Sequence, residues 1–273
     1  MRHELTPGRH VDLGHLDPAD TGKHKDEDAA KTKLARDLER IEKLQDRLYA
    51  EQRHAVLIVL QGMDAAGKDG TVKHVMSGVN PAGCDVVPFK APTPEEAAHD
   101  FLWRIHRATP KRGHITIFNR SHYEDVLVPR AHRTLPGRVI KERYEHINAF
   151  ERILVENGTL VLKFFLHVSK EEQARRLLER LDDPDKRWKF NANDLAERAL
   201  WDRYVEAYEK LLTHCGTKLA PWYCIPADHK WYRNLAVASV LLKKLAELDP
   251  KLPRAALSAA DRARFRRAFA SSG

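Results

Sequence analysis

The sequence predicts an α/β fold in which a five-stranded parallel sheet carries helices on both faces. Five short runs rich in aliphatic and β-branched residues alternate with segments of helical spacing, as βαβ units require. The runs at 55–60 and 159–166 are almost wholly apolar, which is typical of strands covered on both sides. We therefore expect one three-layer domain within the 273-residue chain.

The periodicity places each element in order. We expect strands at 55–60, 85–89, 114–118, 159–166 and 222–225. We expect helices at 67–78, 94–108, 136–157, 169–181, 193–214 and 229–248. A charged amphipathic helix at 27–53 precedes the first strand, and it lies either on the outside of the core or in a dimer contact.

The chain divides into three parts by composition. Residues 1–26 form an irregular arm rich in His, Asp, Pro and Gly, residues 27–250 form the single domain, and residues 251–273 form a basic tail. The longest uncharged apolar run is too short to cross a bilayer, and the first residues lack a signal-peptide core. Three cysteines without a CxxC pair exclude a disulfide framework. We expect a cytoplasmic protein with no membrane partner.

The positive charge is concentrated in two places. The net charge is +8, yet residues 101–143 alone contain ten Lys or Arg against three Asp or Glu. The tail from Lys251 holds six basic residues and one acidic residue. Such clustering favours a polyanionic partner, and the alternative is a solvated basic face without a ligand.

A phosphate-binding motif follows the first strand. Residues 62–68 read GMDAAGK, which matches GxxxxGK between a buried strand and a helix. Glycines permit a tight turn whose N–H groups converge on phosphate, and the helix N-terminus adds positive potential. A plain strand-to-helix turn is the alternative. The loop residues that we expect at the nucleotide and phosphate site are Gly62, Ala65, Ala66, Gly67, Lys68 and Asp69.

Two carboxylates beside this loop need explanation. Asp69 stands where the motif usually has the Ser or Thr that holds magnesium. Phosphate repels a carboxylate there unless a metal or a neighbouring base compensates. We therefore expect Asp64, inside the loop, to be the first metal ligand, and a local turn former is its alternative role.

A second polar cluster follows the third strand, at the sheet edge where ligands of open α/β folds gather. Asn119 replaces an expected acid and is expected at the nucleotide and phosphate site, and Arg120 is placed to neutralise charge during transfer. Glu124 and Asp125 complete a magnesium shell or fix the acceptor, and the alternative is an ion-pair cluster with Arg120. His122 is expected to be a structural hydrogen-bonding residue.

Residues 171–194 suggest a lid. Ser169 is an expected N-cap, Arg180 lies on the helix that follows, and Pro184 breaks that helix before the next begins. Lys186 and Lys189 lie in the break. A mobile lid of this kind excludes water from transferred phosphoryl groups, and the alternative is a surface hairpin with internal salt bridges.

Three segments in order resemble the type 2 polyphosphate kinases: GMDAAGKDG (62–70), NRSHYEDVLVPR (119–130) and RLDDPDKRWKFNANDLAERALWDRY (180–204). The likeness covers about residues 27–248. It implies a P-loop, thymidylate-kinase-like fold with a helical lid, and magnesium-dependent transfer between inorganic polyphosphate and a nucleotide. By position, the resemblance implies four catalytic residues: Asp64 as the metal and phosphate-site carboxylate, Lys68 as the loop lysine, Arg120 as the arginine after the third strand and Arg180 as the lid arginine. It also implies that Lys186 and Lys189 are lid bases near the phosphates.

The residues around Asn119 resemble the subgroup that phosphorylates both nucleoside mono- and diphosphates, so we expect AMP and ADP as acceptors and ATP as a product. Mg²⁺ is the expected metal, with Mn²⁺ as an alternative. A homo-oligomer is also expected. The basic residues expected to line a polyphosphate channel are Arg104, Arg107, Lys111, Arg112, Arg130 and Arg133.

Two other functions fit parts of the sequence. An ATP-dependent nucleotide kinase would use the same scaffold but would not accept polyphosphate as donor. A nucleic-acid-binding P-loop protein would use the basic stretches, although no helix-turn-helix, zinc-finger or RNA-binding signature is present. We therefore expect no specific nucleic-acid partner.

Overall fold

The computed structural model describes residues 3–254 and 257–271. Its centre is a five-stranded sheet in the order β2-β3-β1-β4-β5, and every neighbouring pair is parallel. The strands are β1 (Ala55–Gln61), β2 (Cys84–Pro88), β3 (Ile115–Asn119), β4 (Thr159–His167) and β5 (Trp222–Pro226). The predicted α/β fold and parallel sheet are confirmed, and each predicted strand boundary lies within one residue of the observed one.

Strand β1 lies at the centre because all seven of its residues are buried between two helical layers. It pairs with β3 on one side and with β4 on the other, so Leu60 lies beside Asn119 and Gln61 beside Phe165. This register brings the ends of β1 and β3 to one edge of the sheet. Ligands of open α/β sheets bind at such an edge.

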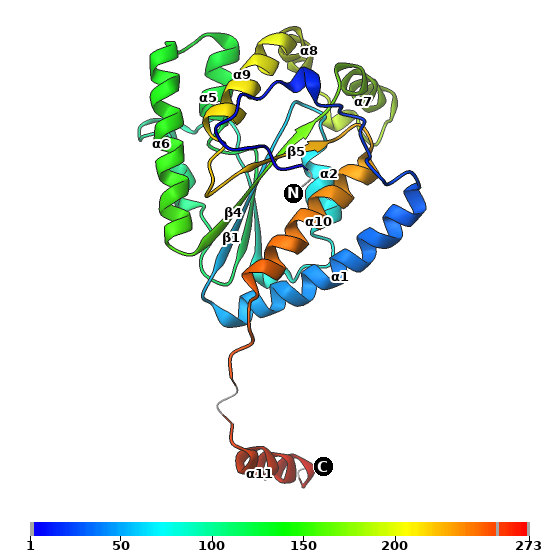
Figure 1. Ribbon diagram of the computed structural model, residues 1–273, viewed down its shortest axis with the longest axis vertical. Coiled ribbons are helices and arrows are strands. Elements are labelled where there is room, and N and C mark those ends of the chain that lie inside the picture. The colour runs from blue at the N-terminus through cyan, green and yellow to red at the C-terminus, as the bar shows by residue number, and fades with distance from the viewer. Residues whose placement is uncertain (1–2, 255–256, 272–273) are drawn as a thin grey trace.

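Helices cover both faces of the sheet (Figure 1). On one face, α1 (Glu27–Glu51) and α2 (Lys68–Val75) pack against α10 (Lys230–Leu248). On the other face lie α5 (Glu124–His132), α6 (Gly137–Glu156) and α9 (Trp201–His214). Helices α7 (Lys170–Asp182) and α8 (Asn193–Ala199) lie near the carboxyl ends of the strands, joined through a short 3-10 turn at Arg187–Lys189.

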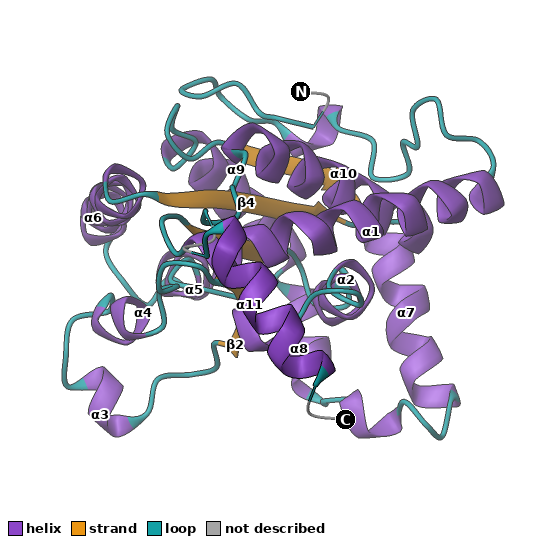
Figure 2. Cartoon of the chain, turned by 90° about the horizontal axis from the view of Figure 1, so that it is seen from below, coloured by secondary structure: helices purple, strands orange, loops and turns teal. Residues whose placement is uncertain are grey.

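Two expected helices are each divided into two. The segment 94–108 forms α3 (Pro94–Ala97) and α4 (Trp103–Arg107), which Figure 2 shows on the periphery. The Asp100 carboxylate accepts a hydrogen bond from the Leu102 N–H, so a new turn begins there. The segment 193–214 forms α8 and α9, which meet at Leu200, a residue outside helical geometry.

Helix α5 was not expected, and it occupies the second polar cluster. Glu124 and Asp125 lie in its first turn, while Arg130 and His132 lie in its last. Acids near the N-terminus and bases near the C-terminus match the helix dipole. This charge pattern favours the helix, and the Asp125 carbonyl, which Pro129 has no N–H to bond, accepts a hydrogen bond from Arg143 at 2.6 Å instead.

The N-terminal arm is mostly irregular, as expected, apart from a 3-10 turn at Leu13–His15. Its backbone pairs with edge strand β5, since the Leu5 N–H donates to Trp222 O and the Cys224 N–H donates to His3 O, both at 2.8 Å. The arm therefore covers an edge that would otherwise present unpaired backbone groups.

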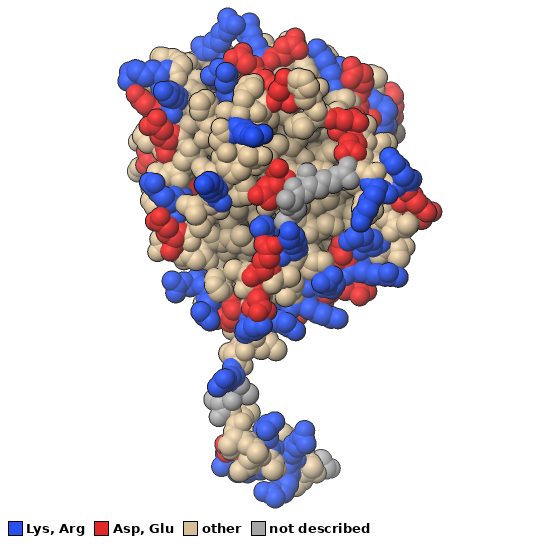
Figure 3. All heavy atoms as spheres, viewed as in Figure 1, with Lys and Arg blue, Asp and Glu red and all other residues tan. Residues whose placement is uncertain are grey.

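The basic tail contains α11 (Ala259–Ala270), which starts at the N-cap Ser258 and stands apart from the domain in Figure 1. On the face shown in Figure 3, acidic and basic side chains are interspersed over the domain, whereas those of α11 are mostly basic. Within residues 3–254 and 257–271, no helix is both long and apolar enough to span a bilayer.

Candidate active site

A cleft of about 490 Å³ opens at the carboxyl edge of the sheet. Its lining comes from the loop after β1, the segment after β2, the start of α5, the lid helices and α9. The loop and the strand-end cluster, which are distant in sequence, therefore meet in one cavity. Of the predicted site residues, those that line it are Gly62, Asp64, Arg104, Arg120, Glu124 and Asp125.

Both motif glycines are required by close approaches. A Cβ at Gly62 would lie 2.7 Å from Leu166 O. Gly67 has φ +103°, and a Cβ there would lie 1.7 Å from an Arg233 guanidinium nitrogen. A side chain at Gly62 would displace the backbone of β4, and one at Gly67 would displace the Arg233 guanidinium and strain a backbone φ that other residues rarely adopt.

Lys68 is the first residue of α2, and its side chain is directed back into the loop. Its ammonium donates to Gly62 O at 2.7 Å and to Met63 O at 3.1 Å. Burial lowers the pKa of Lys68, as does the charge of Arg120, while nearby carboxylates oppose the shift. Through these two hydrogen bonds, Lys68 holds the conformation of the loop.

Arg120 and Asp64 form the central ion pair of the cleft, with 2.7 Å between Nη2 and Oδ1. The Arg120 backbone has φ +63°, and its N–H donates to Leu60 O, which anchors it at the end of β1. Burial opposes the guanidinium charge, yet Glu124 and Asp64 raise the pKa of Arg120 above its ordinary value. A permanent cation thus pairs with Asp64 and senses the charge of Glu124 in the same cleft.

Asn119 explains how Asp69 is tolerated beside a phosphate loop. The Asn119 amide donates to Asp69 Oδ1 at 2.6 Å and so fastens α2 to the end of β3. An acid at position 119 would bring a second negative charge to this contact. Asparagine supplies a neutral donor instead.

Further carboxylates lie around the ion pair. Glu124 accepts a hydrogen bond from the Gln61 amide at 3.1 Å, and Asp125 lies 3.4 Å from Arg104. Burial raises the pKa of Asp125 and, together with the charge of Asp64, that of Asp194 on α8. The carboxylates of Asp64, Glu124, Asp125 and Asp194 therefore line the same cleft.

These carboxylates fit a divalent cation that is completed by ligand and water. Among the residues described, no cluster of three or more His, Cys, Asp or Glu forms a ready-made metal cage. Magnesium needs only one or two protein carboxylates when phosphates and waters supply the rest. The buried and unpaired Gln61 Oε1 adds an oxygen donor beside Glu124, so the donor set suits such an ion.

The lid has the expected helix–break–helix form. Ser169 caps α7 by accepting from the Glu172 N–H, and Arg180 lies 3.6 Å from Asp194, which joins α7 to α8. Lys186 pairs with Glu179 and Asp183 at 2.7 Å each, and Lys189 lies over the Trp188 ring. The structure therefore does not bring Lys186 and Lys189 to the loop, because acids and an aromatic ring on the lid itself engage them.

The six expected channel residues do not form one line. Arg104 lines the cleft, Arg107 stacks on Trp103, and Arg130 pairs with Glu206. Arg133 ends α5. The two remaining residues, Lys111 and Arg112, lie in the turn before β3, at the opposite end of the sheet from the cleft. A channel that reaches the loop cannot include these two, because the length of β3 separates them from it.

His122 lies outside the cleft lining and belongs to a buried ionic cluster. Its Nε2 lies 3.4 Å from Glu151, which also accepts from the Tyr123 hydroxyl and from Lys163 at 2.6 Å each. Burial lowers the pKa of His122. This contact pattern agrees with a hydrogen-bonding residue of the core.

Three side chains that were not predicted from the sequence donate hydrogen bonds to the loop carbonyls: Gln173, Arg176 and Arg233. Gln173, Arg176 and Arg180 are spaced by three and four residues, which places them along one face of α7. This spacing could have indicated that Gln173 and Arg176 face the same site as Arg180. The cleft also has an aromatic wall that the motifs do not reveal. It consists of Phe89, Trp201, Tyr204 and Tyr208.

The chain resembles known proteins over nearly its whole length. Residues 23–253 match the family model described as Polyphosphate kinase 2. The AMP/ADP-polyphosphate phosphotransferase of Meiothermus ruber is 50% identical over 254 residues, covering 93% of this chain and 95% of the relative. The ADP-polyphosphate phosphotransferase of Rhodopseudomonas palustris is 44% identical over 262 residues, covering 90% and 89%.

Solved structures agree with this assignment. The crystal structure of polyphosphate kinase 2 from Arthrobacter aurescens superimposes with a TM-score of 0.93 at 40% identity, covering 100% of this chain and 96% of that one. Its similarity extends over the sheet, the loop and the lid together. The chain therefore belongs to the polyphosphate kinase 2 family.

Proposed function

We propose that this chain is a polyphosphate-dependent nucleotide kinase, which transfers phosphoryl groups between inorganic polyphosphate and AMP or ADP. The relative named an AMP/ADP-polyphosphate phosphotransferase supports it, since half of the aligned residues are identical over almost the full length. The observation that carries the proposal is the Arg120 guanidinium, paired with Asp64 in the cleft that Glu124 and the phosphate loop also line.

Phosphoryl transfer depends mainly on positioning and charge, because the protein has little covalent chemistry to perform. In the proposal, the N–H groups at the start of α2 hold one phosphate. Arg120 then neutralises charge on the group in transfer, and Arg180 adds a second cation from the lid.

A divalent cation, Mg²⁺ with Mn²⁺ as an alternative, completes the proposed site. Asp64 and Glu124 would hold it, and it would supply further neutralisation of phosphate oxygens. Asp125 is a weaker candidate than Glu124 because Arg104 already engages it. Glu124, by contrast, has a neutral amide neighbour.

The aromatic wall supports a nucleotide as the acceptor. Phe89, Trp201 and Tyr204 line the same cleft as the loop and offer flat apolar surface to a nucleobase. The acceptor phosphate would then face Arg120. In the proposal, closure of the lid brings Lys186 and Lys189 toward the phosphate chain and excludes water. Self-association and a cytoplasmic location stay predictions.

The test is phosphotransfer without ATP. Purified protein is mixed with Mg²⁺, polyphosphate and either AMP or ADP, and nucleotides are separated by chromatography. We expect ADP and ATP to appear only when polyphosphate is present. Phosphorylation of AMP by ATP alone would identify an ATP-dependent kinase, and salt-sensitive binding of duplex DNA without transfer would favour the nucleic-acid alternative.

A matched pair of variants localises the activity. Arg120→Gln removes the proposed transfer cation, whereas Arg152→Gln removes an exposed arginine of α6. We expect a loss of turnover on the order of 10³-fold for the first variant and none for the second. Equal rates in the two variants would contradict the role of Arg120.

A further inference from the structure

The phosphate loop is held from behind, carbonyl by carbonyl. Lys68 binds Gly62 O and Met63 O, and the Gln173 amide donates to Asp64 O at 3.0 Å. Arg176 Nη1 donates to the next two carbonyls, those of Ala65 at 2.9 Å and Ala66 at 3.1 Å. Every carbonyl from residue 62 to residue 66 thus accepts a hydrogen bond from a side chain.

Arg176 uses all five of its N–H donors. Besides the two loop carbonyls, its Nη2 donates to Ala227 O at 2.6 Å and to Asp228 O at 2.9 Å, beyond β5. Its Nε donates to Glu172 at 2.7 Å. Only 5% of the residue is exposed. A single buried guanidinium therefore joins the lid helix, the phosphate loop and the end of β5.

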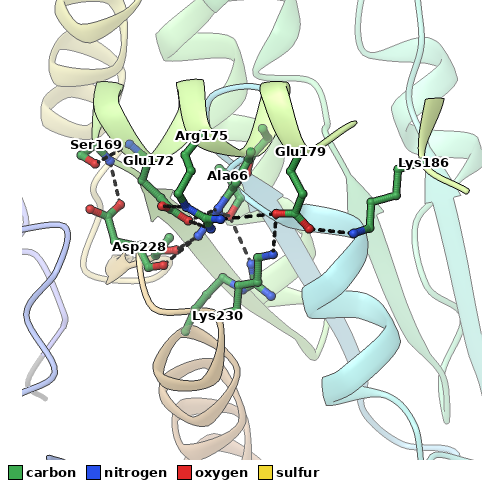
Figure 4. Close-up of polar contacts among 12 residues, drawn as sticks. Ala66, Ser169, Glu172, Arg175, Glu179, Lys186, Asp228 and Lys230 are labelled. Atoms are coloured by element: carbon green, nitrogen blue, oxygen red, sulfur yellow. Dashed lines mark hydrogen bonds and ion pairs between the residues drawn. The ribbon is translucent and has the colours of Figure 1, made fainter. Parts of the chain in front are cut away.

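The first turns of α7 are fastened at the same place (Figure 4). The Ser169 N–H donates to Asp228 Oδ1 at 2.8 Å, and Glu172 pairs with both Arg175 and Arg176. The second lid helix joins the cluster through Arg198, which donates to Gln173 Oε1 at 2.6 Å. The chain of contacts runs from α8 through Gln173 to the loop.

These contacts affect the backbone N–H groups of the loop, which are the donors proposed to bind phosphate. A cation bonded to a peptide carbonyl polarises that peptide and strengthens its N–H as a donor. The Ala66 carbonyl, which receives Arg176 and Arg233, shares its peptide with the Gly67 N–H at the start of α2. The same bonds hold Ala65 at φ +61°, a conformation that a non-glycine residue adopts at a cost.

We propose that Arg176 is a positioning residue, which sets the phosphate-binding conformation of residues 62–68 and, with Gln173, couples the lid to that loop. The inference rests on the proposed function in taking the loop as the phosphate site. Arg176 itself contacts no reacting atom. Its loss would therefore weaken phosphate binding and turnover by releasing the backbone of the loop from its phosphate-binding conformation.

The neighbouring arginines provide a matched test. Arg175 and Arg176 share Glu172, but 59% of the Arg175 side chain is exposed against 6% for Arg176, and only Arg176 reaches the loop. Arg176→Lys keeps the charge but not the five-donor fork. We expect Arg176→Lys to weaken tripolyphosphate binding about tenfold and to lower kcat on the order of 10²-fold. Arg175→Lys should change both less than about twofold.

Two direct readouts separate positioning from stability. Amide hydrogen exchange of residues 64–68 should accelerate in Arg176→Lys and not in Arg175→Lys, while exchange of the sheet is equal in both. The KM for AMP should change little in comparison with kcat, because the aromatic wall is untouched. A folded Arg176→Lys protein that exchanges, binds tripolyphosphate and turns over like Arg175→Lys overturns the proposal.

A second variant covers the case in which Arg176→Lys does not fold. Gln173→Leu removes one neutral hydrogen bond to the loop and leaves the buried arginine in place, and it should accelerate exchange at residues 64–66. Unchanged exchange there also overturns the coupling. Absence of phosphotransfer in the wild-type protein refutes the proposed function instead, and the exchange comparison still decides the role of Arg176.

Discussion

The root of the lid and its tip are held by contacts of opposite character. At the root, Gln173 and Arg176 are buried and bonded to backbone carbonyls of the loop. At the tip, Lys186 pairs only with acids of the lid itself, and 78% of Trp188 is exposed. Releasing the root would leave buried carbonyls unpaired, whereas water and salt screen the ion pairs of the tip. Any closure of the lid therefore belongs to its tip.

The largest effect is expected within the loop. Lys68→Ala removes the loop charge and two hydrogen bonds, so we expect phosphotransfer to fall on the order of 10³-fold or more while circular dichroism shows a folded protein. Lys73→Ala, on the exposed side of the same helix, is the control. Near-normal turnover of Lys68→Ala would mean that the loop does not hold phosphate.

Gly67→Ala tests how closely the root is packed. The new Cβ would lie 1.7 Å from Arg233 at a backbone φ of +103°, so we expect the free energy of unfolding to fall by about 3 kcal/mol. Gly137→Ala, at an open position in α6, should be neutral or slightly stabilising. Urea denaturation measures both, and equal stability of the two variants would refute the tight contact.

Glu172→Gln tests the electrostatics of the root through pH. Hydrogen bonds from Arg175, and then Arg176, lower the pKa of Glu172 to about 2. Because the folded-state pKa is depressed, the stabilisation is fully present above about pH 5 and is lost as the pH falls toward 2. We expect the variant to lose about 2 kcal/mol at pH 7, allowing for screening at exposed Arg175, and progressively less toward acid pH.

Urea denaturation at a series of pH values measures this difference. Glu171→Gln alters the exposed neighbouring acid and should show no pH-dependent loss of unfolding free energy. If Glu172→Gln lowers the free energy of unfolding by the same amount from pH 7 to pH 3, the ion pairs of Glu172 are not the source of that loss.

The smallest effect on stability is expected at the tip. Lys186→Gln should leave the midpoint of thermal unfolding unchanged within error, because its ion pairs are exposed. If the tip closes over polyphosphate, the KM for polyphosphate rises severalfold. Lys244→Gln, which breaks a comparable pair with Glu247 on α10, is the control for both measurements. A clear drop in the unfolding midpoint for Lys186→Gln would show that the tip is as firmly held as the root.

The prediction from sequence succeeded where local pattern and burial coincide. Strands covered on both faces read as apolar runs, so their boundaries were found within one residue. Helix α5 was missed because polar residues dominate its start and Pro129 lies inside it. The loop was located because glycine and lysine at fixed spacing mark it.

The partners of the loop were harder to predict, because they come from distant parts of the chain. Arg176 is 111 residues from Ala65, and Arg233 is 167 residues from Ala66. As sequence features, both resemble ordinary helical arginines. Lys111 and Arg112 illustrate the opposite error. They lie in a basic stretch of the sequence, but they precede β3, and the cleft is at the carboxyl end of that strand.

The sequence by itself determined the sheet, the loop and the kind of ligand, because apolar periodicity and glycine spacing are local properties that survive without knowledge of packing. Only the tertiary structure decided which charges serve the loop. Strand order and helix packing select a few arginines and carboxylates from many, and burial then forces each of them to find a hydrogen-bonding partner.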